Sequence, residues 1–498
     1  MSGELVEVDG SLLEGGGQIL RMSLIISVLS GTPIRVYNIR AGRNKPGLMD
    51  QHLKGVELVS KICNAKIKGA QLGSTEIIFY PGQIKGGYYE ALIKTAGSIS
   101  LLMQVAIPCL LFADGESKLK LQGGTNAEMA PQIEYVTEVF RPIMEKFGAT
   151  FDFQLNRRGY FPRGGGEVEV YIKPISKLKP VRMLEQGQLS KLYGWSFVAG
   201  AVPLGIAHGM ADGADNDLKQ YGINANIERY KESPNMADGN CSGILLVAET
   251  NTGCIFGGSA LGKRDEKPHI TGSRAAMEII KTITDGACVD EHGQDQIIIL
   301  MALAEGTSRI KVGSLTMHTK TAIYVAEKLT KAKFKTIPNG DCTIIECYAH
   351  QPRFSRENTK YNMKDPQSAG NYLYQNMHHH SLSRDSYWNE RVTYNSEIQD
   401  NRHDMEIDDV PSSSSSCMES SPKRMKKSDE VQNTVVETLR IFQQHILKNQ
   451  EEADEDERFG KTVAKLLTEF PSTYKPTIKT TVIKYLSDQL QQYYSLRT

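Results

Sequence analysis

Apolar and polar positions follow two periods along the first 350 residues of the chain. Apolar residues recur at helical spacing in several segments, which predicts helices at residues 18–29, 47–63, 89–111, 130–147 and 321–329. Short apolar or alternating runs between them predict strands at residues 5–8, 34–39, 75–80, 119–121, 167–172 and 310–315. Because one or two amphipathic helices accompany each set of short strands, the pattern predicts a repeated α/β unit.

A change in composition near residues 184–187 interrupts this repeat. The segment that follows has its own strand pattern, with strands predicted at residues 193–203, 243–249 and 254–258. A helix that begins near Thr271 leads back to the first fold. We therefore predict a large domain at residues 1–183 and 281–350, with a smaller α/β domain inserted at residues 184–280.

The character of the chain changes after about His350. Residues 351–430 are rich in polar and charged side chains and poor in branched apolar ones, so they bury too little surface to offset the entropy of ordering. We therefore predict a mostly disordered linker at residues 351–452. The basic cluster at residues 422–427 fits a nuclear-localisation signal, with a chance cluster as the alternative. It favours the nucleus (nucleoplasm) and leaves a cytoplasmic pool open.

Helical patterning returns at residues 453–494. Two apolar stripes are separated by Pro471 and contain Phe459, Val463, Leu466, Leu467, Ile478, Val482, Ile483, Leu486 and Leu490. Two short amphipathic helices of this kind bury their stripes best against a partner. With its acidic lead-in, the segment resembles the BESS motif, which implies protein partners or self-association through these helices. The alternative is a helix pair that packs on the core of its own chain.

Length, net charge and the longest apolar run limit the kinds of protein that this chain can be. The 498 residues suffice for about three domains. Equal numbers of basic and acidic residues, 58 each, give a formal net charge of zero, so any contact with a nucleic acid must be local. The longest apolar run, residues 98–113, contains Gln104 and Pro108 and is too short to span a bilayer, which predicts a protein with no membrane partner.

Residues 14–21 contain three consecutive glycines directly before a predicted helix. A helix that begins after glycines presents unpaired N–H groups and the positive end of its dipole to an anion. Three arginines follow in or after this run, Arg21, Arg40 and Arg43, and arginine suits bidentate contact with phosphate. The pattern therefore favours a phosphate site. A tight turn beside a solvated charged surface is the alternative.

His318 lies between the predicted strand at residues 310–315 and the predicted helix at residues 321–329. Side chains at such junctions reach into clefts, and helix amides there favour developing negative charge. An imidazole in this place can act as a nucleophile. A structural histidine with satisfied hydrogen bonds is the alternative.

These segments, together with residues 123–126, Pro131, residues 164–166, Asp295 and Gln296, resemble an RNA 3′-terminal phosphate cyclase. The resemblance runs from about Leu5 to about Cys347 and leaves the remainder of the chain uncovered. It implies a large domain of three similar α/β modules with a smaller inserted α/β domain.

The resemblance also implies a three-step reaction. The histidine, His318 by its position in the motif, attacks the α-phosphorus of ATP and forms a histidine–AMP intermediate with release of pyrophosphate. AMP then passes to the 3′-phosphate of an RNA end, and the neighbouring 2′-hydroxyl closes a 2′,3′-cyclic phosphate. Division of one displacement into steps through a nitrogen nucleophile is covalent catalysis.

The roles that the resemblance implies fall into three groups. Glu14 contacts a divalent metal, Mg²⁺ or Mn²⁺. The phosphate and RNA-end contacts come from Arg21, Arg40, Arg43, Gln51 and His52. The ATP contacts come from Gln104, Pro131, His292, Asp295, Gln296 and His318. His292 stands where the family often has an aromatic phenol, so we expect an altered adenine contact there. A first-turn acid that caps its helix is the other interpretation of Asp295, and the two roles are compatible.

The family also includes a branch that lacks the catalytic histidine and serves ribosome biogenesis. A non-catalytic cyclase-like RNA-binding factor is therefore the alternative function, and a nuclear interaction scaffold is a further one. The presence of His318 favours an ATP-dependent enzyme that acts on RNA 3′-phosphate ends.

Overall fold

The computed structural model describes residues 4–237 and 239–349. The first module contains β1 (Val6–Asp9), α1 (Gly17–Ser30), β2 (Ile34–Tyr37), α2 (Asp50–Cys63), β3 (Lys66–Lys68) and β4 (Ile77–Tyr80). The second contains β5 (Gly87–Leu92), α3 (Ile99–Leu110), β6 (Ser117–Gly123), α4 (Ile133–Tyr135), η1 (Val136–Phe140), α5 (Arg141–Lys146), β7 (Asp152–Arg157) and β8 (Gly166–Ile172). The third contains β9 (Arg182–Met183), α8 (Gln294–Leu303), β14 (Gly306–Val312), α9 (Met317–Leu329), β15 (Lys333–Asn339) and β16 (Cys342–Ala349).

The sheets of the three modules share one topology. Their strand orders are β1-β2-β4-β3, β5-β6-β8-β7 and β9-β14-β16-β15. In each sheet the first two strands pair in parallel and the remaining pairs are antiparallel. A parallel pair needs a crossover, and a helix supplies it in each module. The predicted α/β fold with three repeated modules is confirmed within the described residues.

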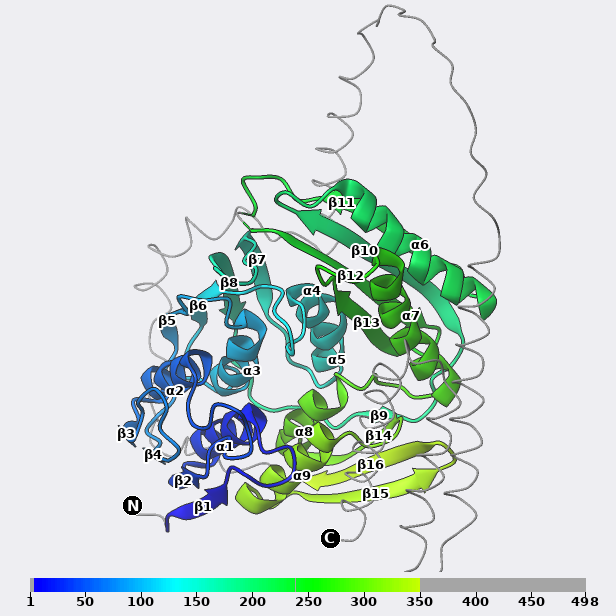
Figure 1. The fold of residues 1–498 in the computed structure, drawn as a ribbon. Coiled ribbons are helices and arrows are strands. Elements are labelled where there is room, and N and C mark those ends of the chain that lie inside the picture. Colours follow the sequence, from blue (N-terminus) through cyan, green and yellow to red (C-terminus); the bar gives the residue numbers. More distant parts are fainter. Residues whose placement is uncertain (1–3, 238, 350–498) are drawn as a thin grey trace, which may run out of the picture. The chain divides into compact units, whose positions relative to one another are not determined.

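The inserted domain is formed by the part of the chain that follows β9 and precedes α8 (Figure 1). It contains β10 (Leu189–Ala199), α6 (Leu204–Gln220), β11 (Asn226–Lys231), β12 (Cys241–Thr250), β13 (Ile255–Leu261) and α7 (Pro268–Asp285). Its sheet has the order β11-β10-β12-β13. Side chains from both helices and from the sheet, such as Ala214, Leu246 and Ile279, form its apolar core. The predicted domain boundary at residue 280 falls inside α7, which continues to Asp285.

The two faces of this inserted sheet have different neighbours. At Gly258 a side chain would point toward α7, where it would meet Ala275 and Ile279. At Gly257 it would point toward Tyr135 and Val139 of the second module, about 3.0 Å from each. Successive strand residues face opposite sides of a sheet. One face of the insert therefore packs on its own helices and the other on the helical segment that begins with α4.

Some element boundaries differ from the sequence prediction. The helix predicted at residues 89–111 is wrong in its first part, because residues 87–92 form β5 and pair in parallel with β6. The helix α3 begins only at Ile99, where the Ser98 hydroxyl accepts a hydrogen bond from the Leu101 amide. The segment predicted as one helix at residues 130–147 begins at Ile133 and includes the π-helical turn η1.

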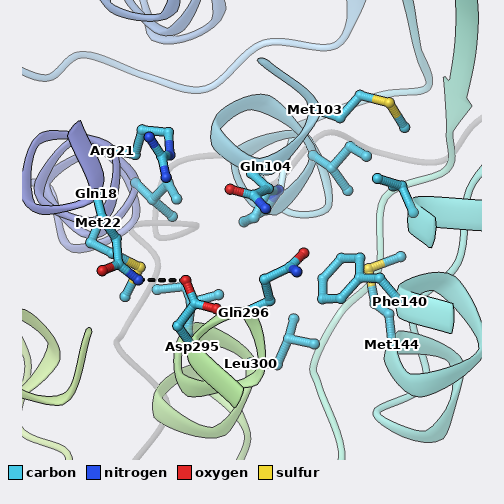
Figure 2. Close-up of a pocket in the computed structure, with 15 residues that line it drawn as sticks. Gln18, Arg21, Met22, Met103, Gln104, Phe140, Met144, Asp295, Gln296 and Leu300 are labelled. Atoms are coloured by element: carbon cyan, nitrogen blue, oxygen red, sulfur yellow. Dashed lines mark hydrogen bonds between the residues drawn. The ribbon is translucent and has the colours of Figure 1, made fainter. Parts of the chain in front are cut away.

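The first helices of the three modules, α1, α3 and α8, are almost entirely buried. A helix that is apolar all round packs in a core, which explains the weak amphipathicity of α1 and α8. Side chains from all three helices converge on one cavity (Figure 2). Among the described residues no helix is long and apolar enough to cross a membrane. The predicted linker, basic cluster and C-terminal helices fall at residues 351–498, outside the described part of the chain.

Candidate active site

A cavity that is open to solvent lies between α1, α3, α8 and the segment η1–α5. Apolar side chains, Phe140 and Met144 among them, lie on the right in Figure 2, whereas polar side chains gather on the left and in the centre. These polar residues are Gln18, Arg21, Gln104, Asp295 and Gln296. An apolar cavity with a few convergent polar groups is the common form of a small-molecule site. Of the predicted residues, the structure thus brings Arg21, Gln104, Asp295 and Gln296 together.

Gln18 connects this cavity to His318. The Gln18 side-chain amide donates to the carboxylate of Asp295 at 2.5 Å, and its carbonyl oxygen lies 3.0 Å from Nδ1 of His318. A carbonyl oxygen can only accept, so Nδ1 carries the ring proton and Nε2 keeps its lone pair. Asp295 fixes the orientation of the amide, and the amide fixes the tautomer of the imidazole. Burial raises the pKa of Asp295, against the lowering effect of the His318 and Arg21 charges.

His318 lies in the first turn of α9 and is exposed. The helix begins one residue earlier than His318, after Thr316, whose hydroxyl accepts a hydrogen bond from the Thr319 amide at 3.1 Å. The histidine therefore belongs to the helix itself, and the sequence prediction placed the helix start a few residues too late. At this position the N-terminal end of the helix dipole faces any anion that approaches the imidazole.

The glycines before α1 allow two functional side chains to approach the backbone. A Cβ on Gly16 would lie 2.1 Å from the carboxylate of Glu14, and a Cβ on Gly17 would lie 2.4 Å from Nε2 of His52. The Glu14 carboxylate accepts a hydrogen bond from the Gly16 amide at 2.7 Å and forms an ion pair with Arg43. A side chain at either glycine would therefore displace the Glu14 carboxylate or the His52 ring.

The three predicted arginines have different partners. Arg40 donates to the carbonyls of Lys45 at 2.6 Å and Gly47 at 3.0 Å, so its guanidinium is held by its own loop. Arg43 is paired with Glu14. Among the described residues, no side chain or carbonyl forms a hydrogen bond or ion pair with the guanidinium of Arg21, and burial lowers its pKa. The Arg21 side chain is half-buried, and a half-buried cation with no such partner favours an anionic ligand beside it.

Arg21 also lines a second, smaller cavity, together with Gln51 and His52. Burial, then the charges of Arg21 and Arg40, lower the pKa of His52 to about 3. The ring is therefore neutral near pH 7. Its Nδ1 accepts a hydrogen bond from the Met49 amide at 3.2 Å, so Nε2 carries the proton and can donate to a phosphate oxygen. Gln51 accepts from the Ser98 amide at 3.1 Å and ties this group to the second module.

Pro131 and His292 lie outside the set of residues that line the larger cavity. The Pro131 carbonyl accepts from the hydroxyl of Ser100, one turn before Gln104 on α3, at 2.7 Å. The His292 carbonyl accepts from the amide of Gln296 at 2.7 Å. The side-chain oxygen of Gln296 is buried without a partner, so it is available to a donor on a ligand. Pro131 is thus hydrogen-bonded to a residue of α3, and His292 is hydrogen-bonded to a residue of α8.

The described residues contain no cluster of three or more side chains that could hold a metal ion by itself. Glu14 is a single carboxylate, and its two oxygens already serve Gly16 and Arg43. Magnesium commonly binds one or two carboxylates together with substrate phosphates and water. The donor set therefore fits a metal that arrives with a nucleotide, and not a permanent metal centre.

The sequence model of the family described as RNA 3′-terminal phosphate cyclase matches residues 12–336. The chain belongs to this cyclase family. It is 40% identical over 347 residues to the RNA 3′-terminal phosphate cyclase of Drosophila melanogaster, which covers 69% of this chain and 96% of that protein. It is 42% identical over 346 residues to the cyclase of Staphylothermus marinus, with 69% and 95% covered.

The chain also has a weak resemblance to a solved structure. The enolpyruvyl transferase NikO of Streptomyces tendae matches with 10% identity and a TM-score of 0.28, over 71% of this chain and 49% of that one. A score this low supports no conclusion about the fold.

Two parts of the site were absent from the sequence prediction. Gln18 lies inside the glycine-containing run at residues 14–21, yet its link to His318 spans 300 positions and leaves no local pattern. Asp290 is buried and accepts four hydrogen bonds, from Tyr135, Gly257, His292 and Gly293. The spacing of residues along the sequence predicts neither the Gln18 link nor the Asp290 hydrogen bonds, because each connects segments that lie far apart in the chain.

Proposed function

We propose that the chain is an ATP-dependent RNA 3′-terminal phosphate cyclase that acts through a histidine–AMP intermediate. Family membership supports the overall reaction, which is the formation of a 2′,3′-cyclic phosphate at an RNA 3′ end. The observation that carries the proposal is the hydrogen-bonded chain from Asp295 through Gln18 to His318. It leaves one nitrogen of an exposed imidazole free to act as a nucleophile.

In the first step Nε2 of His318 attacks the α-phosphorus of ATP. A nitrogen–phosphorus bond forms, the bond from the α-phosphorus to the bridging oxygen breaks, and pyrophosphate leaves with that electron pair. The ring gains positive charge as the bond forms. The Gln18 carbonyl, which already accepts a hydrogen bond from Nδ1–H, disperses this charge, and the Asp295 carboxylate accepts a hydrogen bond from the amide group of Gln18.

In the second step an oxygen of the RNA 3′-phosphate attacks the same phosphorus and displaces His318. In the third step the 2′-hydroxyl of the terminal ribose attacks the 3′-phosphorus, loses its proton and releases AMP. Dispersed charge on the phosphate oxygens requires cationic and hydrogen-bonding groups. Arg21 and the Nε2–H of neutral His52 fill these roles, because both are free of competing partners on that side.

The nucleotide occupies the polar end of the larger cavity, against Gln104, Asp295 and Gln296. The unpaired oxygen of Gln296 accepts a hydrogen bond from a donor on the nucleotide. Glu14 would hold a divalent metal, Mg²⁺ or Mn²⁺, together with the phosphates. When bound, the metal neutralises negative charge on those phosphates and on the pyrophosphate that departs.

A direct test uses an RNA oligonucleotide with a 3′-phosphate, ATP and a divalent metal. The proposal predicts that the full-length protein converts the end into a form that resists phosphatase, and that conversion stops when ATP is omitted. An RNA with a 3′-hydroxyl should remain unchanged. If folded protein binds the RNA but leaves its 3′-phosphate open to phosphatase, the non-catalytic RNA-binding function would replace this one.

A further inference from the structure

The inserted domain contributes none of the side chains that line the larger cavity. Its hydrogen bonds nevertheless converge on two short segments beside that cavity. One is residues 131–135, at the start of the helical segment that continues through η1, and the other is residues 290–293, directly before α8. These segments carry Pro131 and His292, two of the predicted ATP contacts that lie outside the lining set.

The first segment is held to the sheet of the insert through Gln132. Its side-chain amide donates to the backbone carbonyls of Ile244 on β12 at 3.2 Å and Ala260 on β13 at 3.4 Å. Its own oxygen accepts from the amide of Asn126 at 3.1 Å. Gln132 is 2% exposed, so water does not compete for these bonds. The residue next to Pro131 is therefore fixed to two strands of the insert.

A buried ion network holds the same segment from a second side. Arg158 forms ion pairs with Glu134 of α4 and with Glu232, which directly follows β11 of the insert and lies 2.9 Å from Nε of Arg158. The side chains of Arg158 and Glu232 are 1% and 2% exposed. Buried charges of this kind cannot separate without leaving an unpaired charge in a low-dielectric interior. Glu232 thus binds α4 firmly through the arginine.

The second segment is fixed by Asp290. Its carboxylate accepts from the Tyr135 hydroxyl at 2.6 Å, from the backbone amide of Gly257 on β13 at 2.8 Å, and from the amides of His292 at 2.9 Å and Gly293 at 2.8 Å. The residue is 3% exposed. One carboxylate therefore joins α4, the insert and the turn that carries His292.

The imidazole of His292 also contacts the insert directly. Its Nε2 lies 3.2 Å from Glu278 on α7, and the other carboxylate oxygen of Glu278 accepts from the Ser259 amide on β13 at 2.8 Å. The ring packs edge-on against Tyr135, with centroids 6.2 Å apart. The side chain at this position is thus held between the two segments and the insert.

We propose that the inserted domain positions the outer wall of the ATP site, with Glu232 and Glu278 as the positioning residues that set Pro131 and His292. The proposal rests on the function proposed above. It gives the insert a role in nucleotide affinity without contact to the reacting atoms. Since neither residue touches His318 or its partner Gln18, loss of either one weakens ATP binding and leaves the chemical step largely intact.

The test compares full-length wild type with Glu232→Gln and Glu278→Gln, which keep side-chain size and remove one charge. The readout is the ATP concentration dependence of label transfer from α-labelled ATP to the protein. We expect the apparent KM for ATP to rise about tenfold, or about 1.4 kcal/mol, with the rate at saturating ATP within about twofold of wild type. The control is Asp212→Asn, which breaks an exposed ion pair with Arg229 in the same domain and should change neither value.

An unchanged KM in the folded Glu232→Gln and Glu278→Gln proteins would overturn the positioning role. So would a fall in the saturated rate with no change in KM, since that places the residues in the chemistry. If Glu232→Gln does not fold, Tyr135→Phe replaces it in the test. This change removes only the hydroxyl that donates to Asp290, and we expect it to raise the KM for ATP as well. Absence of label on the wild type would refute the proposed function instead, so the two failures are distinct.

Discussion

Replacement of Gln18 by Met tests the hydrogen-bonded chain that prepares His318. Met has a similar length and no hydrogen-bonding amide, so the change removes both the 3.0 Å contact to His318 and the 2.5 Å contact to Asp295. A neutral hydrogen bond contributes about 1 kcal/mol net, and one to a charged group about 1.5–3 kcal/mol. The contact to His318 is neutral before attack and charge-assisted once the ring carries positive charge.

Only the interaction that strengthens in the transition state affects the chemical step. The difference, about 0.5–2 kcal/mol, predicts that the rate of label transfer from α-labelled ATP falls at least about twofold and at most about 30-fold at saturating ATP. The unpaired carboxylate of Asp295 should also lower the free energy of unfolding by about 1–3 kcal/mol. Denaturant unfolding measures the second effect, and single-turnover label transfer measures the first.

Gln104→Met is the matched control. Gln104 lines the same cavity on α3 (Figure 2), and among the described residues no hydrogen bond joins it to His318. We expect this variant to raise the KM for ATP and to keep the saturated rate. If Gln18→Met stays folded and transfers label within twofold of the wild-type rate, the chain from Asp295 to His318 has no part in preparing the nucleophile.

Three further results are expected. Gly17→Ala should displace the His52 ring, because the new Cβ would lie 2.4 Å from Nε2, and RNA cyclisation should fall while label transfer from ATP continues. Arg21→Met should raise the pKa of His52 from about 3, and inorganic phosphate should raise it in the wild type, as NMR titration of the ring would show. The hydrogen bond to Glu278 raises the pKa of His292 to about 9, so its contribution to stability is full below about pH 6.5 and is lost as pH rises through about 9. Thermal melts of wild type and Glu278→Gln should therefore differ most at the acid end of this window and converge above it.

Local sequence patterns were sufficient to predict many of the helices and strands. Residues 18–29 have a continuous apolar helix pattern after the glycines, and the structure has α1 at Gly17–Ser30. The strand predicted at residues 167–172 corresponds to β8 at Gly166–Ile172, whose residues alternate between buried and half-buried. In both cases the side-chain period and the burial agree, so the sequence alone carries the information.

The errors have a common physical cause. Residues 89–92 fit a helix locally, but parallel pairing with β6 stabilises a strand, and that partner lies about thirty positions away. A π-helical turn at Val136–Phe140 likewise has no local signal, and its residue Val139 lies against Gly257 of the insert. At residues 89–92 a tertiary contact thus overrides the local preference.

In the candidate site too, some features can be predicted from local sequence and others depend on tertiary packing. The glycine run, the arginines and His318 were recognisable because each lies in a compact motif, and the structure places Arg21, Asp295 and Gln296 around one cavity. The relay through Gln18 and the ties at Asp290 join modules that are distant in sequence. Such links are set by the way in which the modules pack, which no window of the sequence contains.

The most direct test of the central claim is label transfer from α-labelled ATP to wild type and to His318→Ala, with a divalent metal and no RNA. The account predicts label on the wild type that survives denaturation and base, is lost in acid as a phosphoramidate should be, and is absent from the variant. His318→Ala removes an exposed side chain, so the fold should persist. Equal label on the folded variant, or none on folded wild type, would contradict nucleotidyl transfer through His318.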